Sequence, residues 1–240
     1  MKILVSVVSV SEAEAVLDGG ADILDVKNVN EGSLGASFPW LIRRVAEMCR
    51  DRPITLSATL GDLPYKPGTA ALAADGAVHA GARYIKAGLH GTSDHAQALE
   101  VMSAVVRACR DAHPSATAVA AGYADYRRFQ GLDPQTIVEV AQASGADVVM
   151  LDTAIKDGLG LFNALTEDEL TTFVSAGHAA GLQVALAGSV KAKDVGLLRR
   201  LGSDVVGIRG AVCRGQDRAR SIDAELVRAF VARATTTVAA

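Results

Sequence analysis

Short apolar runs rich in β-branched residues alternate along the chain with longer amphipathic runs. The short runs predict strands, because β-branched residues favour the extended form, and the longer runs predict helices with one apolar face. The expected strands begin near Ile3, Ala21, Ile54, Tyr84, Ala116, Asp147, Gln183 and Asp204. The expected helices cover residues 11–17, 39–49, 68–79, 94–112, 134–144, 167–180, 191–201 and 220–234.

Several connections between a helix and the next strand repeat one short sequence motif, in which glycine ends the helix and the chain turns back. The motif occurs as Gly20-Ala21-Asp22, Gly81-Ala82-Arg83, Gly145-Ala146-Asp147 and Gly202-Ser203-Asp204. Eight strand–helix pairs of about thirty residues each indicate parallel strands with right-handed crossovers, closed into a barrel. The prediction is an α/β protein, a single (β/α)8 TIM-barrel domain over residues 1–235. Residues 236–240 form a tail, and we expect fraying from Ala234 onward.

Composition narrows the range of partners. Half of the 240 residues are hydrophobic and the formal net charge is −3, so no basic field predicts binding to nucleic acid or to a membrane surface. The three cysteines, Cys49, Cys109 and Cys213, are far apart and odd in number, which argues against disulfides and zinc and suits a cytoplasmic protein. The opening residues are too short and too polar for a signal peptide or a membrane span, and resemble a first strand.

A barrel of this kind carries its active site at the carboxyl ends of the strands. The run from Ala21 to Asn28 predicts that Ile23, Asp25 and Lys27 share one strand face. The charged or basic residues expected at the same end of the later strands are Lys66, Lys86, His90, Asp125, Asp152, Lys156 and Arg209.

The cluster of Asp25, Lys27, Lys86, Asp152 and Lys156 favours catalysis over structure. A buried ion pair is the alternative for Asp25 with Lys27, and Lys66 or Lys156 alone would be read as solvated charges. Clustered lysines in an apolar setting lower one another's pKa, and a neutral lysine can attack a carbonyl to form an iminium. A neighbouring base then removes the proton from the adjacent carbon, so these residues predict Schiff-base chemistry.

The loops after the last two strands predict a phosphate site. Gly188-Ser189 follows the seventh strand and Gly207-Ile208-Arg209-Gly210 follows the eighth, where TIM barrels bind phosphate through backbone N–H groups. Arg209 would add a bidentate contact. The expected ligand is therefore a small phosphorylated molecule. The five histidines show no ligand spacing, so we predict neither a metal nor a cofactor, and only His90 is a candidate to touch substrate.

Long strings at these same positions resemble the (5-formylfuran-3-yl)methyl phosphate synthases. The strings are 25–28, 31–36, 57–69, 84–89, 120–125 and 152–158, and the resemblance runs from residue 1 to about 230. It implies a lyase similar to class I aldolases, which condenses two molecules of glyceraldehyde 3-phosphate into a furan aldehyde phosphate. One phosphate and two waters would be lost, and the product would feed methanofuran-type cofactors of one-carbon metabolism.

The resemblance also implies residue roles. Lys27 would form the Schiff base and Lys86 would accept the proton, with Asp25, Asp152 and Lys156 in support. The loops at Gly188 and Gly207 would hold one phosphate, and Lys156, Lys66 or Arg127 the other. Ala87, where a larger apolar residue is expected, is a minor departure outside the chemistry.

Three other functions stay open. They are another class I aldolase acting on a sugar phosphate, a phosphosugar isomerase or epimerase that forms no imine, and a barrel that binds a phosphometabolite without catalysis. We also expect a homo-oligomer formed through the outer helices, for which Phe38, Trp40 and Phe230 are candidate contacts. The loop 30–37 could close over substrate, in which case Gly32 and Gly35 would be its hinges.

Overall fold

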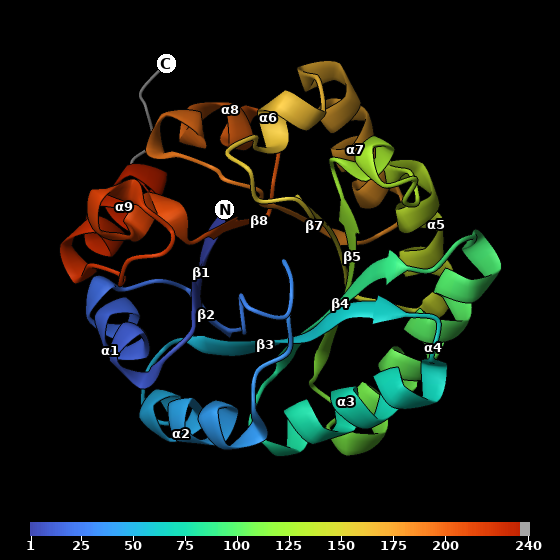
Figure 1. Cartoon of the computed structure of the whole chain (residues 1–240), viewed down its shortest axis with the longest axis horizontal. Helices are drawn as coiled ribbons and strands as arrows, with labels where there is room; N and C mark the ends of the chain where they lie inside the picture. Colours follow the sequence, from blue (N-terminus) through green and yellow to red (C-terminus); the bar gives the residue numbers. More distant parts are fainter. Residues whose placement is uncertain (236–240) are drawn as a thin grey trace.

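The computed structural model describes residues 1–235, in which eight parallel strands close into a barrel in chain order, inside a ring of helices (Figure 1). The strands are β1 (Lys2–Val7), β2 (Ile23–Val26), β3 (Thr55–Pro64), β4 (Tyr84–Gly91), β5 (Thr117–Tyr123), β6 (Val148–Asp152), β7 (Gln183–Leu186) and β8 (Val205–Ile208). Leu4 of β1 pairs with Ile23 on one side and with Gly207 on the other, which closes the barrel. The predicted TIM barrel is confirmed.

The helices follow the strands as the amphipathic pattern predicts. They are α1 (Val10–Gly19), α2 (Pro39–Cys49), α3 (Pro67–His79), α4 (His95–Ala112), α5 (Pro134–Ser144), α6 (Leu161–Ala164), α7 (Glu167–Ala179), α8 (Val195–Arg200) and α9 (Ala224–Thr235). Asp133 accepts hydrogen bonds from the first amides of α5, and Thr166 with Glu169 forms a capping box on α7. None of these helices, within residues 1–235, is both long and apolar enough to span a bilayer.

Four elements differ from the sequence-based expectation. β3 continues past Thr59 to Pro64, because it pairs with an equally long β4 through two register shifts. The short helix α6 was not expected. The helix expected over 191–201 is split into a 3-10 turn at Ala192–Asp194 and α8. The last helix begins only at Ala224, since the preceding chain folds back through a bridge between Cys213 and Ile222.

Aspartates at the third position of the repeated helix-to-strand motif form hydrogen bonds that connect the amino ends of neighbouring strands. Asp22 Oδ2 accepts a hydrogen bond from the Ile3 amide at 2.7 Å. Asp147 accepts from the Ala118 amide at 2.7 Å, and Asp204 from the Val184 amide at 2.8 Å. Each aspartate accepts a hydrogen bond from an N–H group of the preceding strand. The repeated motif therefore stabilises the pairing of the barrel strands and is not part of the active site.

The barrel interior has an apolar floor with a polar layer above it. One inward position on each of four strands is apolar, and the next inward position two residues later is polar. These pairs are Leu4 and Ser6, Ile23 and Asp25, Tyr84 and Lys86, and Met150 and Asp152. A second apolar core lies between the outer side of the strands and the helices. Because side chains alternate along each strand, the charged residues lie inside the barrel at its carboxyl end, above the apolar layer.

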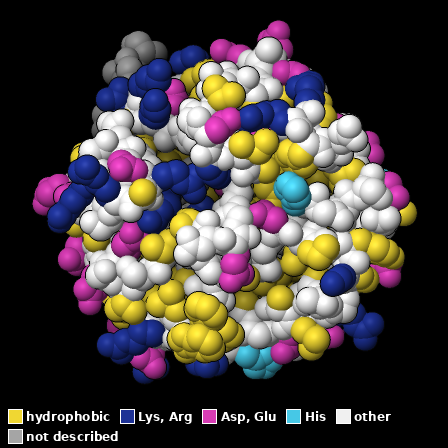
Figure 2. Space-filling view, in the orientation of Figure 1, with side chains coloured by type: hydrophobic (Ala, Val, Ile, Leu, Met, Phe, Trp, Pro, Cys, Tyr) yellow, Lys and Arg dark blue, Asp and Glu magenta, His cyan; other side chains and the backbone are white. Residues whose placement is uncertain are grey.

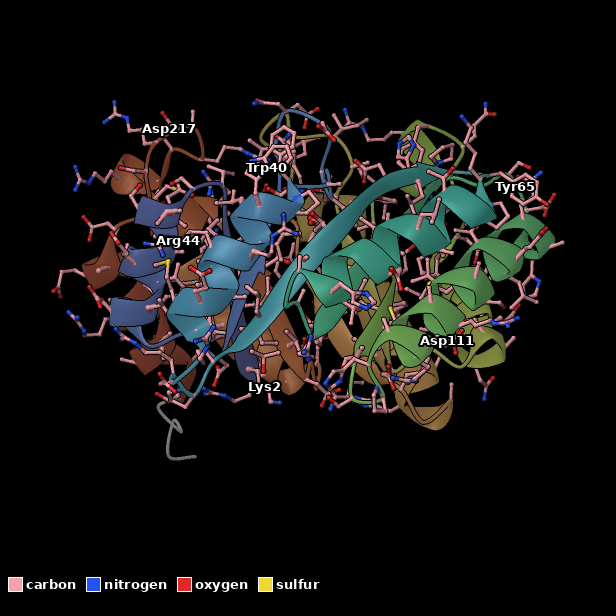
Figure 3. All side chains as sticks on the ribbon, turned by 90° about the horizontal axis from the view of Figure 1, so that it is seen from below. Lys2, Trp40, Arg44, Tyr65, Asp111 and Asp217 are labelled. Atoms are coloured by element: carbon pink, nitrogen blue, oxygen red, sulfur yellow. The ribbon has the colours of Figure 1, made fainter. Side chains whose placement is uncertain are left out.

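The chain end and the candidate interface residues are only partly as expected. Ala234 is buried and its carbonyl accepts a hydrogen bond from Arg199 at 2.6 Å, so the helix is intact to Thr235. The expected tail 236–240 lies outside the described residues. Phe230 packs in the core, which excludes it from an interface. Phe38 and Trp40 stack at 4.6 Å and are exposed, and Trp40 lies at the same end of the barrel as Tyr65 and Asp217 (Figure 3).

Candidate active site

Asp25 of β2 is the centre of a buried hydrogen-bond network that joins it to three other strands. Ser6 of β1 and Ser57 of β3 lie in register with Asp25 on either side. Their hydroxyls donate to its carboxylate at 2.8 and 2.7 Å. Lys86 of β4 donates from Nζ to Asp25 Oδ2 at 2.7 Å. Burial alone would raise the pKa of Asp25, but the charges of Lys86 and Lys27 and these hydrogen bonds outweigh it and lower the pKa.

A second ion pair forms at the end of β6. Lys156 Nζ lies 2.7 Å from Asp152 Oδ1 and 3.0 Å from Thr153 Oγ1. The Thr153 amide also donates to Asp152, at 2.7 Å. Burial acts to raise the pKa of Asp152, yet Lys156 and Lys27 hold that pKa at about 2. Asp152 is therefore an ionised carboxylate near neutral pH.

Lys27 lies between these two pairs without an ion pair of its own. It follows the last residue of β2, and its amide still bonds to the Val7 carbonyl at 3.0 Å. Its Nζ donates to the Ser33 carbonyl at 3.3 Å. Burial lowers the pKa of Lys27 from 10.5 to about 8; Asp152 opposes this effect, and the charges of Lys86 and Lys156 add to it. The expected repulsion between lysines is present, but burial is the larger cause.

The loop between β2 and α2 lies across the mouth of the barrel (Figure 1). Leu34 is fully buried, Ser33 Oγ donates to the Thr153 carbonyl at 2.7 Å, and Thr59 donates to the Gly35 carbonyl at 2.6 Å. A Cβ on Gly35 would lie 2.1 Å from the Asn28 carbonyl oxygen, and one on Gly32 would lie 2.0 Å from Asp62. These glycines permit close packing in the docked loop, and closure of the loop over substrate stays a prediction.

A cavity of about 350 Å³ opens at the carboxyl end beside Lys27, Lys86, Asp152 and Lys156. The loops after β7 and β8 form its opposite wall, which includes Gly188, Ser189, Gly207, Arg209 and Gly210. Lysine and arginine side chains gather around the hollow near the centre of this face (Figure 2).

Backbone N–H groups are available on that wall. Among residues 1–235, the amides of Ser189 and Val190 after β7, and of Gly210 and Ala211 after β8, make no hydrogen bond. Unpaired amides next to cationic side chains favour an anion, and a phosphate above all. The predicted glycine loops therefore lie where a phosphate could bind.

Three predicted binding residues lie elsewhere or are already engaged. Lys66 is exposed at the start of α3, and His90 stacks on Phe129 at 4.4 Å; neither lines the cavity. Arg127 is paired with Glu169 on the surface at 2.8 Å.

Arg209 lines the cavity, but its guanidinium is engaged from behind. Its Nη1 and Nη2 atoms lie 2.7 and 3.1 Å from the two carboxylate oxygens of Glu12. Nη1 also donates to the Ser6 carbonyl at 3.1 Å. The bidentate face predicted for a phosphate is thus occupied by Glu12, which was not anticipated because α1 carries it from the far end of the sequence.

Sequence reasoning gave no role to several residues of the site: the hydroxyls of Ser6, Ser57 and Thr153, and the side chains of Lys191 and Arg218. The serines carry a readable signal, since each is a polar residue at an inward strand position. Lys191 and Arg218 are on loops, and only the folded chain brings them to the cavity. Within residues 1–235, no three His, Cys, Asp or Glu side chains gather as a metal site would require.

The arrangement suits chemistry on a carbonyl compound. Lys27 supplies a buried amine whose pKa is lowered to about 8. Asp25 and Asp152 supply fixed negative charge, and the free amides supply an anion site. The fold and the site together define a TIM barrel with a buried lysine–aspartate centre at the carboxyl ends of its strands.

Comparison with known proteins identifies the family. Residues 3–231 match the family model described as 4-HFC-P synthase, so the chain belongs to this family of enzymes. It is 49% identical over 229 residues to the (5-formylfuran-3-yl)methyl phosphate synthase of Methanocaldococcus jannaschii, covering 95% of this chain and 97% of the relative. The synthase of the same name from Methanothermobacter thermautotrophicus is 54% identical over 218 residues, covering 91% and 92%. The resemblance stated from sequence motifs is confirmed.

Solved structures share the fold at low sequence identity. The 3-hexulose-6-phosphate synthase from Salmonella typhimurium superposes with a TM-score of 0.66 at 18% identity, covering 98% of this chain and 100% of that one. The deoxyribose phosphate aldolase from Aeropyrum pernix gives a TM-score of 0.64 at 16% identity, covering 88% and 86%. These similarities support the TIM-barrel architecture.

Proposed function

We propose that this protein condenses two molecules of glyceraldehyde 3-phosphate into (5-formylfuran-3-yl)methyl phosphate through a Schiff base on Lys27. The observation that carries the proposal is the buried Lys27 amine, whose pKa is about 8, beside the two ion pairs of the cavity. The relatives that share about half of its sequence carry the name of this synthase, which supports the same product here. The product would serve the synthesis of methanofuran-type cofactors.

The first steps use the residues of the cavity. Lys27 Nζ attacks the aldehyde carbon of one triose phosphate, and loss of water gives an iminium. The Lys86 ammonium donates its proton to the departing hydroxyl group, which leaves as water. The resulting free amine takes the proton from the adjacent carbon, and the electron pair moves into the iminium to give an enamine. Asp25, at 2.7 Å from Lys86 Nζ, stabilises the ammonium that forms.

The later steps account for the atoms of the product. Phosphate leaves from one triose, a carbon–carbon bond joins it to the second triose, and two dehydrations close and aromatise the ring. Two triose phosphates minus one phosphoric acid and two waters have the composition of the furan aldehyde phosphate. Asp152 and Lys156, linked at 2.7 Å, are placed to relay protons during these dehydrations.

Incubation with glyceraldehyde 3-phosphate alone tests the proposal. We expect a furan aldehyde chromophore to appear, with release of one inorganic phosphate for each product molecule, and no product from Lys27→Ala. Turnover of the triose phosphate to an acyclic product would contradict the proposed condensation.

The second candidate is another class I aldolase that acts on a sugar phosphate. The same Lys27 environment favours it, since a retro-aldol reaction also begins with an imine on a buried amine. It predicts imine trapping with a sugar phosphate and no furan from triose phosphate, so the experiment above separates the two functions.

A further inference from the structure

The cations that line the cavity differ in whether they already have a partner. Lys86 is paired with Asp25, Lys156 with Asp152, and Arg209 with Glu12. Three others form no ion pair with any residue of the described chain: Lys27, Lys191 and Arg218. Lys27 is the proposed nucleophile and Lys191 is an exposed loop residue, which leaves Arg218 as the one unpaired guanidinium on the cavity wall.

The segment between Cys213 and Ile222 folds back on itself and carries Arg218 to the mouth of the barrel. The Cys213–Ile222 bridge and a hydrogen bond of 3.1 Å from the Arg214 amide to the Ser221 carbonyl close the base of this segment. Asp217, its neighbour, lies at the carboxyl-end face of the barrel (Figure 3). The carboxylate of Asp217 pairs with Arg220, at 3.5 Å, and so does not neutralise Arg218.

Arg218 lies directly beside the free amides after β8. A Cβ built on Gly210 would be 3.6 Å from the Arg218 Cβ, so the two residues are in van der Waals contact range. Gly210 and Ala211 carry two of the unpaired N–H groups of this wall. A guanidinium and free amides that line the same cavity form an arrangement that suits a phosphate dianion.

Arg218 is also partly desolvated without a partner in the chain. It is half-buried, and burial lowers its pKa, an effect to which Arg209 adds and which Asp152 opposes. A guanidinium held in this way costs free energy that an incoming anion would recover. Arg209 is the weaker candidate, because its Nη1 and Nη2 atoms already donate to Glu12 and Ser6, and its Nε, which has no partner among the described residues, is buried.

We infer that Arg218, rather than Arg209, supplies the guanidinium that binds the phosphate of a triose phosphate against the amides of the β8 loop. The substrate class rests on the proposed function. Arg209 then contributes a fixed positive charge to the cavity wall, where Glu12 holds its guanidinium. The phosphate group, and not the aldehyde, is the part of the substrate that Arg218 selects.

Variants of two arginines on the same segment test this assignment. Arg218→Gln removes the proposed contact, and Arg218→Lys keeps the charge but loses the bidentate geometry. Arg214→Gln is the matched control with the same charge change, because Arg214 is exposed and pairs with Asp223 rather than with Asp217. Two quantities are measured for each: the KM for glyceraldehyde 3-phosphate, and the affinity for inorganic phosphate by calorimetric titration. Melting temperatures close to that of the wild type verify that each variant is folded.

We expect Arg218→Gln to raise the KM and to weaken phosphate binding by about 10- to 100-fold, as for loss of a charge-assisted contact. Arg218→Lys should fall between, and Arg214→Gln should match the wild type. An unchanged KM and unchanged phosphate affinity in Arg218→Gln overturn the assignment, as does an equal effect of Arg214→Gln.

Failure of the proposed function gives a different result. If the wild type makes no furan product, the condensation is wrong, and the calorimetric titration alone then decides on Arg218. Phosphate binding by the wild type that weakens only in the Arg218 variants would still support the site. Absence of phosphate binding together with absence of product overturns both.

Discussion

Lys86 Nζ lies 2.7 Å from Asp25 Oδ2, and the two side chains are 1% and 0% exposed. This pair leaves the neighbouring Lys27 without a counter-ion of its own. The two lysines therefore differ in their surroundings: Lys86 is held by a carboxylate, whereas Lys27 is buried with a carbonyl as its hydrogen-bond acceptor. In the proposed mechanism, that difference assigns the attack on the aldehyde to Lys27 and the proton transfer to Lys86.

The lowered pKa of Lys27 predicts the pH dependence of imine formation. With a pKa of about 8, roughly one tenth of Lys27 is neutral at pH 7, against about one in 3,000 for an ordinary lysine. We expect the rate of reductive trapping with glyceraldehyde 3-phosphate and cyanoborohydride to rise with pH through a midpoint near 8. A midpoint above about 9.5 would show that Lys27 is not the titrating group.

Two variants should move that midpoint in opposite directions. Asp152 raises the pKa of Lys27, and Lys156 lowers it. Asp152→Asn should therefore shift the midpoint to lower pH, and Lys156→Met should shift it to higher pH. The midpoints of the trapping profiles measure both shifts, and equal shifts in one direction would contradict the electrostatic explanation.

Lys27 is expected to destabilise the fold near neutral pH. Its folded pKa, about 8, lies below its unfolded value of 10.5, so the unfolded chain binds more protons between these values. The penalty is fully present below pH 8 and disappears as the pH rises through 10.5. Lys27→Met should raise the free energy of unfolding by about 2–3 kcal/mol at pH 7 and by less at pH 9.5.

Denaturant unfolding at the two pH values measures this effect. Lys27→Met should also abolish furan formation, so the gain in stability accompanies a loss of function. A variant that is less stable than the wild type at pH 7 would show that the Lys27 contacts hold the fold together.

Glu12 is expected to matter for stability although it does not line the cavity. Its carboxylate and the Arg209 guanidinium are each only 7% exposed. Glu12→Gln leaves a buried cation without its counter-ion and should cost about 3 kcal/mol. The surface pair Arg44–Glu47 is the control: its side chains are more than half exposed, so Glu47→Gln should change stability by less than about 0.5 kcal/mol.

Urea unfolding of both variants makes the comparison. Similar small losses in the two would show that Arg209 finds another partner, such as solvent in the cavity. That outcome would also restore Arg209 as a candidate phosphate ligand.

The barrel, and the meeting of charged residues at the carboxyl ends of its strands, could be predicted from the sequence, because both depend on local periodicity. The alternation that places Ile23 below Asp25 and Tyr84 below Lys86 is a property of each strand by itself. Once the strands are known to be parallel and closed, their carboxyl ends must meet, and so must Asp25, Lys86 and Asp152.

The binding residues on loops could not be predicted in the same way. The pairing of Arg209 with Glu12 joins residues 197 positions apart, and no local pattern marks it. A helix was expected from residue 220, whereas the chain folds back before residue 224 and carries Arg218 to the cavity. Lys66 was placed at the rim because β3 was expected to end at Thr59, but the strand continues to Pro64 and moves Lys66 outward.

The most direct test of the central claim is the mass of the intact protein after borohydride treatment with glyceraldehyde 3-phosphate, followed by peptide mapping. We expect one stable adduct on Lys27, absent from Lys27→Ala and present in Lys156→Met. Normal turnover of the triose phosphate with no adduct on any lysine would contradict imine catalysis and leave an acid–base enzyme that uses Lys86 and Asp152.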